Sequence, residues 1–385
     1  MQQKNKAILI LMHSWVGFIH GVQKGLSQFF AEHPEWMATH HSPFPAQVAR
    51  LGKDHYDGVI AFADHPYYRQ LQRLKTPVVN IANGIANIGL PAVFVDDAAV
   101  GRMAAQYLKD LGLRHFACLG SIDYVYARQR RRAFIDTLTG MNIHVHQASV
   151  SAGWTAVLSL PGGPEAEVLD WLRNLPKPIA IFGTSDAAAS ELLQLCRIAG
   201  IAVPQDVCVL GVDNDEYIAT MSYPPLSSIE LPTEAIGYTA AQLLEKLMAG
   251  EAPPKEPILL QPVRVVSRQS TNVLAIPDAD VVAAVRHIRD YVHESVTVSD
   301  LLRIVPLNRR YFERKFKRHL GRTPLQEILR VRVDRAKELL ATTDLSMPAV
   351  ARRSGFPTAE QLAIVFRRST GTTPTLYRRS HQLRD

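Results

Sequence analysis

Two segments near the C-terminus share a pattern of basic and apolar residues whose chemistry suits contact with duplex DNA. The pattern FxxxFKRxxGxTP, which begins at Phe312, returns fifty residues later as LxxxFRRxxGxTP, which begins at Leu362. In a helix, the apolar pair four residues apart faces inward and the adjacent basic pair faces outward. The glycine is typical of a helix stop, and Thr-Pro is typical of the cap and first turn of the next helix. The repeat therefore predicts two similar basic helices at a fixed separation.

The outward side chains of these two helices are the candidates for contact with DNA. Arginine pairs with guanine and glutamine with adenine, so polar residues just after the predicted helix caps are expected to meet base edges. Basic residues further along each helix are expected to meet phosphates. The alternative for all of them is an ordinary solvated face. The candidates are Asn308, Arg309, Arg310, Glu313, Arg314 and Lys317 in the first helix and Thr358, Glu360, Gln361 and Arg367 in the second.

A longer helix between the two repeats is expected to set their separation. Residues 324–340 have helical apolar spacing, and at 1.5 Å per residue such a helix is about 26 Å long. Successive major-groove faces of DNA lie ~34 Å apart, so this helix can hold the two basic helices near adjacent turns of the groove. Shorter helices are predicted at 280–293, 299–305 and 347–353.

Charge is divided unevenly along the 385 residues. Residues 278–385 contain 21 Lys and Arg against 12 Asp and Glu, a net charge of +9, whereas residues 1–277 have a net charge of −2. This division indicates that the C-terminal part alone binds a polyanion.

No apolar run reaches the ~18 residues that span a bilayer. Three widely spaced cysteines and the lack of a signal-peptide cleavage site favour a reduced, cytoplasmic protein.

The first 270 residues alternate short apolar runs with segments of helical spacing. The apolar runs lie at 6–13, 57–63, 77–82, 115–120, 178–183 and 207–212, and one more strand-like segment lies at 256–266. Helical spacing recurs at 99–111, 129–139, 165–174 and 186–199. This alternation is typical of parallel sheets wound by βαβ crossovers, so the predicted fold class is α/β followed by an all-α tail. The predicted parts are a first domain at 1–268, a linker at 269–279 and a second domain at 280–385.

The α/β part lacks the sequence motifs of several common enzyme classes. It contains no GxSxG nucleophile elbow, no GxxxxGK[ST] phosphate loop, no GxGxxG after a strand and no HExxH. His144 and His146 face one way from a predicted strand without a third ligand, so we interpret them as surface histidines. We therefore expect no catalytic residue, no metal and no cofactor.

Residues 280–380 resemble the DNA-binding domain of the AraC/XylS family of transcription regulators. The two repeats, their caps, the joining helix and Tyr377-Arg378 are the residues that support the resemblance. It implies two helix-turn-helix units joined by one helix. The first unit departs from the family pattern, because Leu302 stands where alanine is usual and Pro306 where glycine is common.

Residues 6–268 resemble the sugar-binding domain of LacI-type repressors and periplasmic binding proteins. The matching elements are Val95-Asp96-Asp97, Arg130-x2-Ala133-Phe134, Thr184-Ser185-Asp186, Gly211-Val212-Asp213-Asn214 and the run from Pro224 to Ile229. The resemblance implies two Rossmann-like lobes that enclose a sugar through carboxylate acceptors, arginine donors and an aromatic face. The ligand-binding residues that it implies are Asp64, Arg130, Trp154, Ser185, Asp186 and Asp213. Leu231 is apolar where relatives often place a polar sugar contact, so the identity of the sugar is left open.

The two resemblances together imply a sugar-responsive transcription regulator, with activation of an operon for a pentose such as D-xylose favoured over repression. The implied partners are a double-stranded DNA operator, the sugar, a second copy of the chain in a homodimer, and RNA polymerase. Three alternatives remain open. They are a response to a different sugar or polyol, a sugar-metabolising enzyme with an accessory DNA-binding tail, and an architectural DNA binder with a vestigial sensor.

Overall fold

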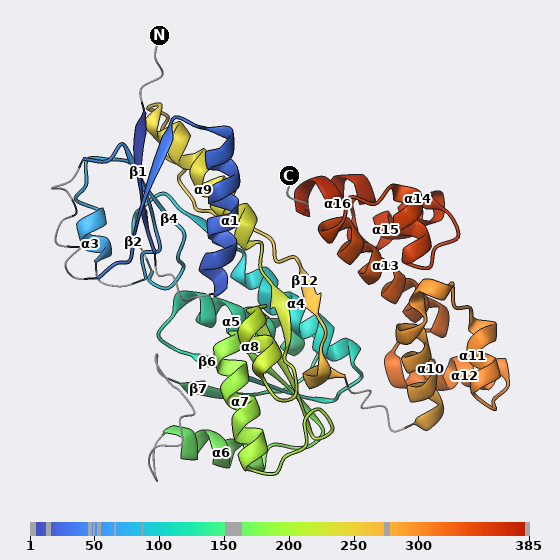
Figure 1. The fold of residues 1–385 in the computed structure, drawn as a ribbon. Helices are drawn as coiled ribbons and strands as arrows, with labels where there is room; N and C mark the ends of the chain where they lie inside the picture. The colour runs from blue at the N-terminus through green and yellow to red at the C-terminus, as the bar shows by residue number, and fades with distance from the viewer. Residues whose placement is uncertain are drawn as a thin grey trace. The chain divides into compact units, whose positions relative to one another are not determined.

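The chain forms two compact units, an α/β unit and a helical unit (Figure 1). The computed structural model describes residues 5–12, 17–44, 48, 51, 55–64, 67–86, 88–150, 164–272 and 278–381. The first unit comprises Met1–Gln106 and His115–Asn272, and the second comprises Tyr107–Arg114 and Val273–Asp385. Among the described residues, no helix is both long and apolar enough to cross a membrane.

The first lobe of the α/β unit is built on a parallel sheet in the strand order β2-β1-β3-β4. Its strands are β1 (Lys6–Leu11), β2 (Trp36–His41), β3 (Gly58–Ala61) and β4 (Val78–Asn80). The inner strand β3 is buried throughout and β1 over most of its length, which explains their continuous apolar sequences. β2 lies at the edge with exposed residues along most of its length, so no apolar run marked it.

Two helices far apart in the sequence, α1 (Gly17–Glu32) and α9 (Thr233–Met248), pack side by side on this lobe (Figure 1). Their approach is close enough to require glycine. A Cβ on Gly25 would lie 1.8 Å from the carbonyl oxygen of Glu234, and a Cβ on Gly237 would lie 2.1 Å from that of Val22. The chain therefore returns to the first lobe after it has built most of the second.

The second lobe is built on a six-stranded sheet in the order β12-β10-β9-β8-β6-β7. The pairs between β10, β9, β8, β6 and β7 are parallel, and β12 is antiparallel to β10. The strands are β6 (His115–Ser121), β7 (Val145–Val150), β8 (Ile179–Gly183), β9 (Val207–Asp213), β10 (Ser227–Glu230) and β12 (Arg264–Val266). The helices of this part are α4 (Asp97–Asp110), α5 (Val125–Thr139), α6 (Pro164–Asn174), α7 (Asp186–Ile198) and α8 (Glu216–Met221).

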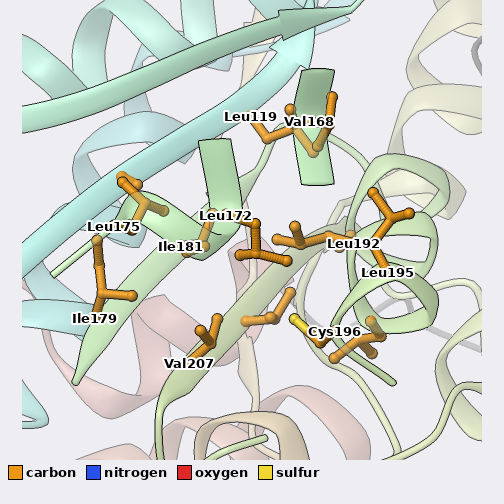
Figure 2. Close-up of a cluster of buried hydrophobic side chains, with 14 of the residues drawn as sticks. Leu119, Val168, Leu172, Leu175, Ile179, Ile181, Leu192, Leu195, Cys196 and Val207 are labelled. Atoms are coloured by element: carbon orange, nitrogen blue, oxygen red, sulfur yellow. The ribbon is translucent and has the colours of Figure 1, made fainter. Parts of the chain in front are cut away.

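One core of the second lobe lies between its sheet and the helices α6 and α7. Figure 2 shows one cluster of apolar side chains that includes Ile179 and Ile181 of β8, Leu172 of α6 and Leu192 of α7, and all four are fully buried. The alternation of strands with helices in the sequence thus produces the predicted α/β layering.

The strand-like segment 256–266 is two strands in different sheets, which corrects the single strand expected from the sequence. β11 (Ile258–Leu260) pairs in parallel with β5 (Val93–Val95), whereas β12 pairs with β10 of the second lobe. Pro262 separates them, and proline has no backbone N–H with which to continue a ladder. The chain crosses here from one sheet to the other.

The helical unit matches the helix pattern expected for the tail. Its helices are α10 (Ala279–Asp290), α11 (Val298–Ile304), α12 (Arg309–Leu320), α13 (Pro324–Thr342), α14 (Met347–Arg353), α15 (Ala359–Thr370) and α16 (Pro374–His381). Both repeats end as predicted, because Gly321 and Gly371 stop α12 and α15 in the left-handed conformation with φ of 70° and 77°. The turn with Pro306 still forms, since the N–H of Leu307 donates to the carbonyl of Val305 at 2.8 Å.

Part of the predicted linker belongs to the α/β unit. Residues Gln269–Thr271 form a short 3-10 helix in which Ser270 and Thr271 are fully buried. The hydroxyl of Ser270 donates to the carbonyl of Val209 in β9 at 2.6 Å. The described chain resumes at Asp278, whose side chain caps α10.

Candidate ligand and DNA sites

Arg130, on α5, lies at the centre of a buried charged cluster in the α/β unit. Its side chain is 5% exposed, its Nε donates to Oδ1 of Asp97 at 2.7 Å, and its Nη1 donates to the carbonyl oxygen of Thr184 at 2.9 Å. Oδ1 of Asp213 lies 3.5 Å from the same Nη1, and the ring of Tyr126 covers the guanidinium at 4.8 Å. Two carboxylates thus compensate one buried positive charge, as burial requires.

Asp213 is the partly open carboxylate of this cluster. It ends β9, and its side chain is 26% exposed, whereas that of Asp97 is 2% exposed. Burial raises the pKa of Asp213 to about 6, although the charge of Arg130 opposes the shift. Its φ of 115° is in the region that favours glycine, and such strained residues are often found at ligand sites. Part of the Asp213 side chain therefore remains accessible to solvent, while its Oδ1 faces the guanidinium of Arg130.

Ser185 and Asp186 support the fold around this cluster. Ser185 caps α7 by accepting from the N–H of Ala188 at 3.2 Å. Asp186 is fully buried, with Oδ1 accepting from the Ser228 hydroxyl at 2.5 Å and Oδ2 from the N–H of Asp215 at 2.9 Å. Asp186 is thus buried and bonded to the protein through both oxygens, so in this structure it positions Ser228 and the backbone of Asp215. Burial, followed by repulsion from Asp213, raises its pKa well above the usual range.

Asp64 comes from the first lobe and lies close to the start of the helix that bears Arg130. A Cβ on Gly84 would be 3.3 Å from the Cβ of Asp64 and 3.6 Å from the ring of Tyr124, so these three residues are neighbours. Partial burial, followed by the charge of Asp64, raises the pKa of Tyr124. The structure thus brings Asp64 to the first turn of α5, while Arg130 and Asp213 contact each other directly. Trp154 lies outside the described residues.

Sequence reasoning missed Asp97 and Asn83. Nδ2 of Asn83 donates to Oδ2 of Asp97 at 2.8 Å, and the carbonyl of Asn83 accepts from the N–H of Tyr126 at 3.0 Å. The neighbouring Asp96 instead accepts from the N–H of Ala99 at the start of α4. The motif Val95-Asp96-Asp97 was the available signal, but it did not distinguish the capping carboxylate from the buried one.

An open cavity of about 1240 Å³ adjoins the charged cluster. Asn83 and Asp97 line it, together with Gln129 and Arg132 of α5. Arg130 and Asp213 are absent from its lining, so Asp97 is the residue of the ion-paired cluster that borders the cavity. We place the ligand candidate at the cluster, because that is where the strained and partly open carboxylate lies.

The two basic helices present the predicted residues to solvent. In α12, Phe312 and Phe316 are buried while Arg310, Arg314 and Lys317 are exposed. In α15, Leu362 and Phe366 are buried while Glu360, Gln361 and Arg367 are exposed.

Several of the predicted DNA contacts also have partners within the chain. The side chain of Asn308 accepts from the N–H of Tyr311 at 2.9 Å, and that of Thr358 accepts from the N–H of Gln361 at 3.2 Å, so both cap their helices. Nε of Arg309 donates to Glu313 at 2.9 Å along the helix surface. An exposed pair of this kind contributes ~1 kcal/mol or less, so a base or phosphate can displace it.

The comparisons with known proteins agree with both halves of this description. Residues 105–271 match the periplasmic binding protein-like domain, and residues 301–380 match a helix-turn-helix domain. The chain is a DNA-binding transcription regulator that joins a periplasmic binding protein-like sensor to an AraC/XylS-type DNA-binding domain.

The similarity to several known regulators extends over the whole length of the chain. The chain is 28% identical to the xylose operon regulatory protein of Haemophilus influenzae, over 98% of this chain and 99% of that protein. It is 29% identical to the xylose operon regulatory protein of Escherichia coli K12, over 98% of each. The solved structure of the xylose-binding transcription activator XylR superposes on this chain with a TM-score of 0.63 and 26% identity, and the superposition covers 100% of each chain. These relatives are regulators, which confirms that the chain is not an enzyme and removes the accessory-tail alternative.

Proposed function

We propose that the chain binds D-xylose, or a closely related pentose, at the cluster of Arg130 and Asp213 and so controls transcription of a sugar-utilisation operon. The observation that carries the proposal is the partly exposed Asp213, held by Arg130 in a chain similar over its whole length to xylose operon regulators. Sugar hydroxyls donate readily to carboxylates. Asp64 supplies a second acceptor from the other lobe.

The sugar would act by favouring one arrangement of the sensor over another. A ligand that touches both lobes binds best when they are close together, and only such a difference in affinity shifts a conformational equilibrium. Because Asp64 and Asp213 belong to different lobes, one sugar held by both would favour closure. This is the change that the helical unit would report to DNA.

We further propose that the regulator works in the cytoplasm as a homodimer and activates transcription through contact with RNA polymerase. A dimer would offer four helix-turn-helix units to repeated half-sites of a double-stranded operator, which supports cooperative binding. A related sugar or polyol remains the second candidate for the effector. Its support is Leu231, a buried apolar residue where a polar sugar contact was expected.

Calorimetric titration of the full chain with D-xylose, other pentoses and xylitol tests this proposal. We expect saturable binding of one sugar, weakened about tenfold or more in Asp213→Asn, because the neutral amide offers a weaker acceptor. Asp136→Asn, which changes an exposed carboxylate in α5, is the matched control and should bind normally. The absence of heat with every sugar and polyol would remove the sensor proposal.

A further inference from the structure

An isoleucine is exposed in the middle of the second basic helix. The side chain of Ile364 in α15 is 69% exposed, although Leu362 and Phe366 on either side of it are almost fully buried. Each residue advances a helix by about 100°, so Ile364 lies on the face opposite to both. The packing of this domain therefore makes little use of the Ile364 side chain.

The other residues on this face are polar or basic. Gln361 lies three positions before Ile364 and Arg368 four positions after it, so the three side chains follow one face of α15, and all are exposed. A single exposed apolar residue is common on protein surfaces and by itself indicates nothing. Ile364 differs because basic and polar residues surround it, and a basic surface of this kind is expected to contact a polyanion.

The major groove of DNA offers one apolar group at its base edges, the C5-methyl group of thymine. An isoleucine has no hydrogen-bond donor or acceptor, so it makes no hydrogen bond to the edges of guanine, adenine or cytosine. Against a thymine methyl it buries apolar surface on both partners. Contact with a methyl group is thus the chemistry by which Ile364 can discriminate between bases.

The matching position of the first basic helix is Arg314, fifty residues earlier. Arg314 is exposed, and its guanidinium lies 5.4 Å from the ring of Tyr311, which matches Gln361. Arginine donates to the O6 and N7 acceptors of guanine. The two helices share a scaffold but present different chemistry at the same position.

We propose that Ile364 contacts the C5-methyl group of a thymine and thereby sets a T·A requirement in the part of the operator that faces α15. The inference rests on the proposed DNA contact of α15 and adds the base that this helix recognises. It also means that the two parts of one half-site are unequal, because Arg314 favours guanine in the part facing α12.

The test uses the full chain and DNA that differs by single methyl groups. Bound sequences are selected from random duplexes, and each thymine of the consensus is then replaced by deoxyuridine, which keeps the hydrogen bonds and lacks the methyl group. We expect one replacement to weaken binding about fourfold, the effect of one methyl-sized apolar group. In Ile364→Ala the same replacement should have no effect. Alanine is well tolerated at an exposed helix position, so the variant is expected to fold.

Two further variants separate this contact from general effects. Ile304→Ala changes an isoleucine that is 41% exposed on α11 and should keep the full response to deoxyuridine. Arg314→Ala should also keep it and relax base preference at a different position. Two results would overturn the inference but not the proposed DNA contact of α15. In one, no thymine of the consensus loses affinity when deoxyuridine replaces it. In the other, the loss of affinity persists in Ile364→Ala. The absence of any consensus would overturn both the inference and the proposed DNA contact of α15.

Discussion

At the scale of single residues, Asp213 links the stability of the sensor to pH. Burial raises the pKa of this carboxyl from 3.8 to about 6, so the folded chain keeps the proton over a range in which the unfolded chain has released it. The stability from this group is therefore fully present below about pH 4 and is lost as pH rises through 6. At 1.36 kcal/mol per pH unit, the loss amounts to ~3 kcal/mol.

The variant Asp213→Asn is expected to remove this dependence, because its side chain is neutral throughout. Urea unfolding of the sensor, measured from pH 4.5 to 7.5, gives the free energy of unfolding of both proteins. The free energy of the variant relative to wild type should rise with pH and become constant above about pH 6. Asp136→Asn is the control, and its profile should run parallel to wild type. If Asp213→Asn also ran parallel, ionisation of Asp213 would not oppose folding.

The sequence predicted some residues of this cluster and not others, for reasons of burial. Arg130 and Asp213 stand in motifs that the resemblance identified, and the structure brings them within 3.5 Å. Asp186 stands in an equally good motif, yet its carboxylate is internal, and no pattern of residue types distinguishes a buried acid from an exposed one. Asp97 was overlooked because its role depends on which of two adjacent aspartates turns inward.

At the scale of elements, α13 depends on a buried carboxylate in its first turns. The side chain of Glu327 is 1% exposed and pairs with Arg330 at 2.8 Å and with Arg322 at 2.5 Å. Burial alone would raise its pKa, but the hydrogen bond and charge of Arg330, with the charge of Arg322, lower it to about 2. The stability from this group is present above pH 4.5 and is lost as pH falls toward 2.

Glu327→Gln is expected to destabilise the helical unit by about 3 kcal/mol at pH 7, because it leaves two partly buried arginines without their shared partner. The deficit should shrink as pH falls below 4.5. Glu338→Gln, in an exposed pair with Arg335 on the same helix, is the control and should cost under ~1 kcal/mol. Circular dichroism against urea at several pH values measures both, and equal losses in the two variants would contradict the assignment.

Elements differ in how well local sequence marks them. Helix ends in the tail were predicted closely, because caps and glycine stops are local signals, as at Asn308 and Gly321. β2 and β10 were not predicted. β2 is an edge strand with little apolar surface, and β10 begins with Ser227 and Ser228, whose hydroxyls are buried in hydrogen bonds with Arg268 and Asp186. Such strands depend on partners distant in the chain, which composition does not reveal.

At the scale of the whole molecule, the segregation of charge predicted two parts with different partners, and the C-terminal residues of the helical unit build two hydrophobic cores of their own. One hydrophobic core gathers residues between Val281 and Ile328, and the other gathers residues between Val333 and Tyr377. Neither takes a buried residue from the α/β unit. The packing of α9 on α1 and the pairing of β11 with β5 were not predictable in this way, because they join segments far apart in sequence.

Residues 278–385, expressed alone, are therefore expected to fold and to bind duplex DNA. Each phosphate contact contributes about −0.9 to the slope of log affinity against log salt, so several basic contacts should give a steep negative slope. Lys317→Ala should reduce the magnitude of this slope by about 1 on every sequence. Arg335→Ala, whose arginine pairs with Glu338 on α13, is the control and should leave the slope unchanged. A fragment that folds but binds DNA without dependence on salt would show that the net charge of +9 serves solubility, and the division of labour between sensor and DNA-binding unit would have to be abandoned.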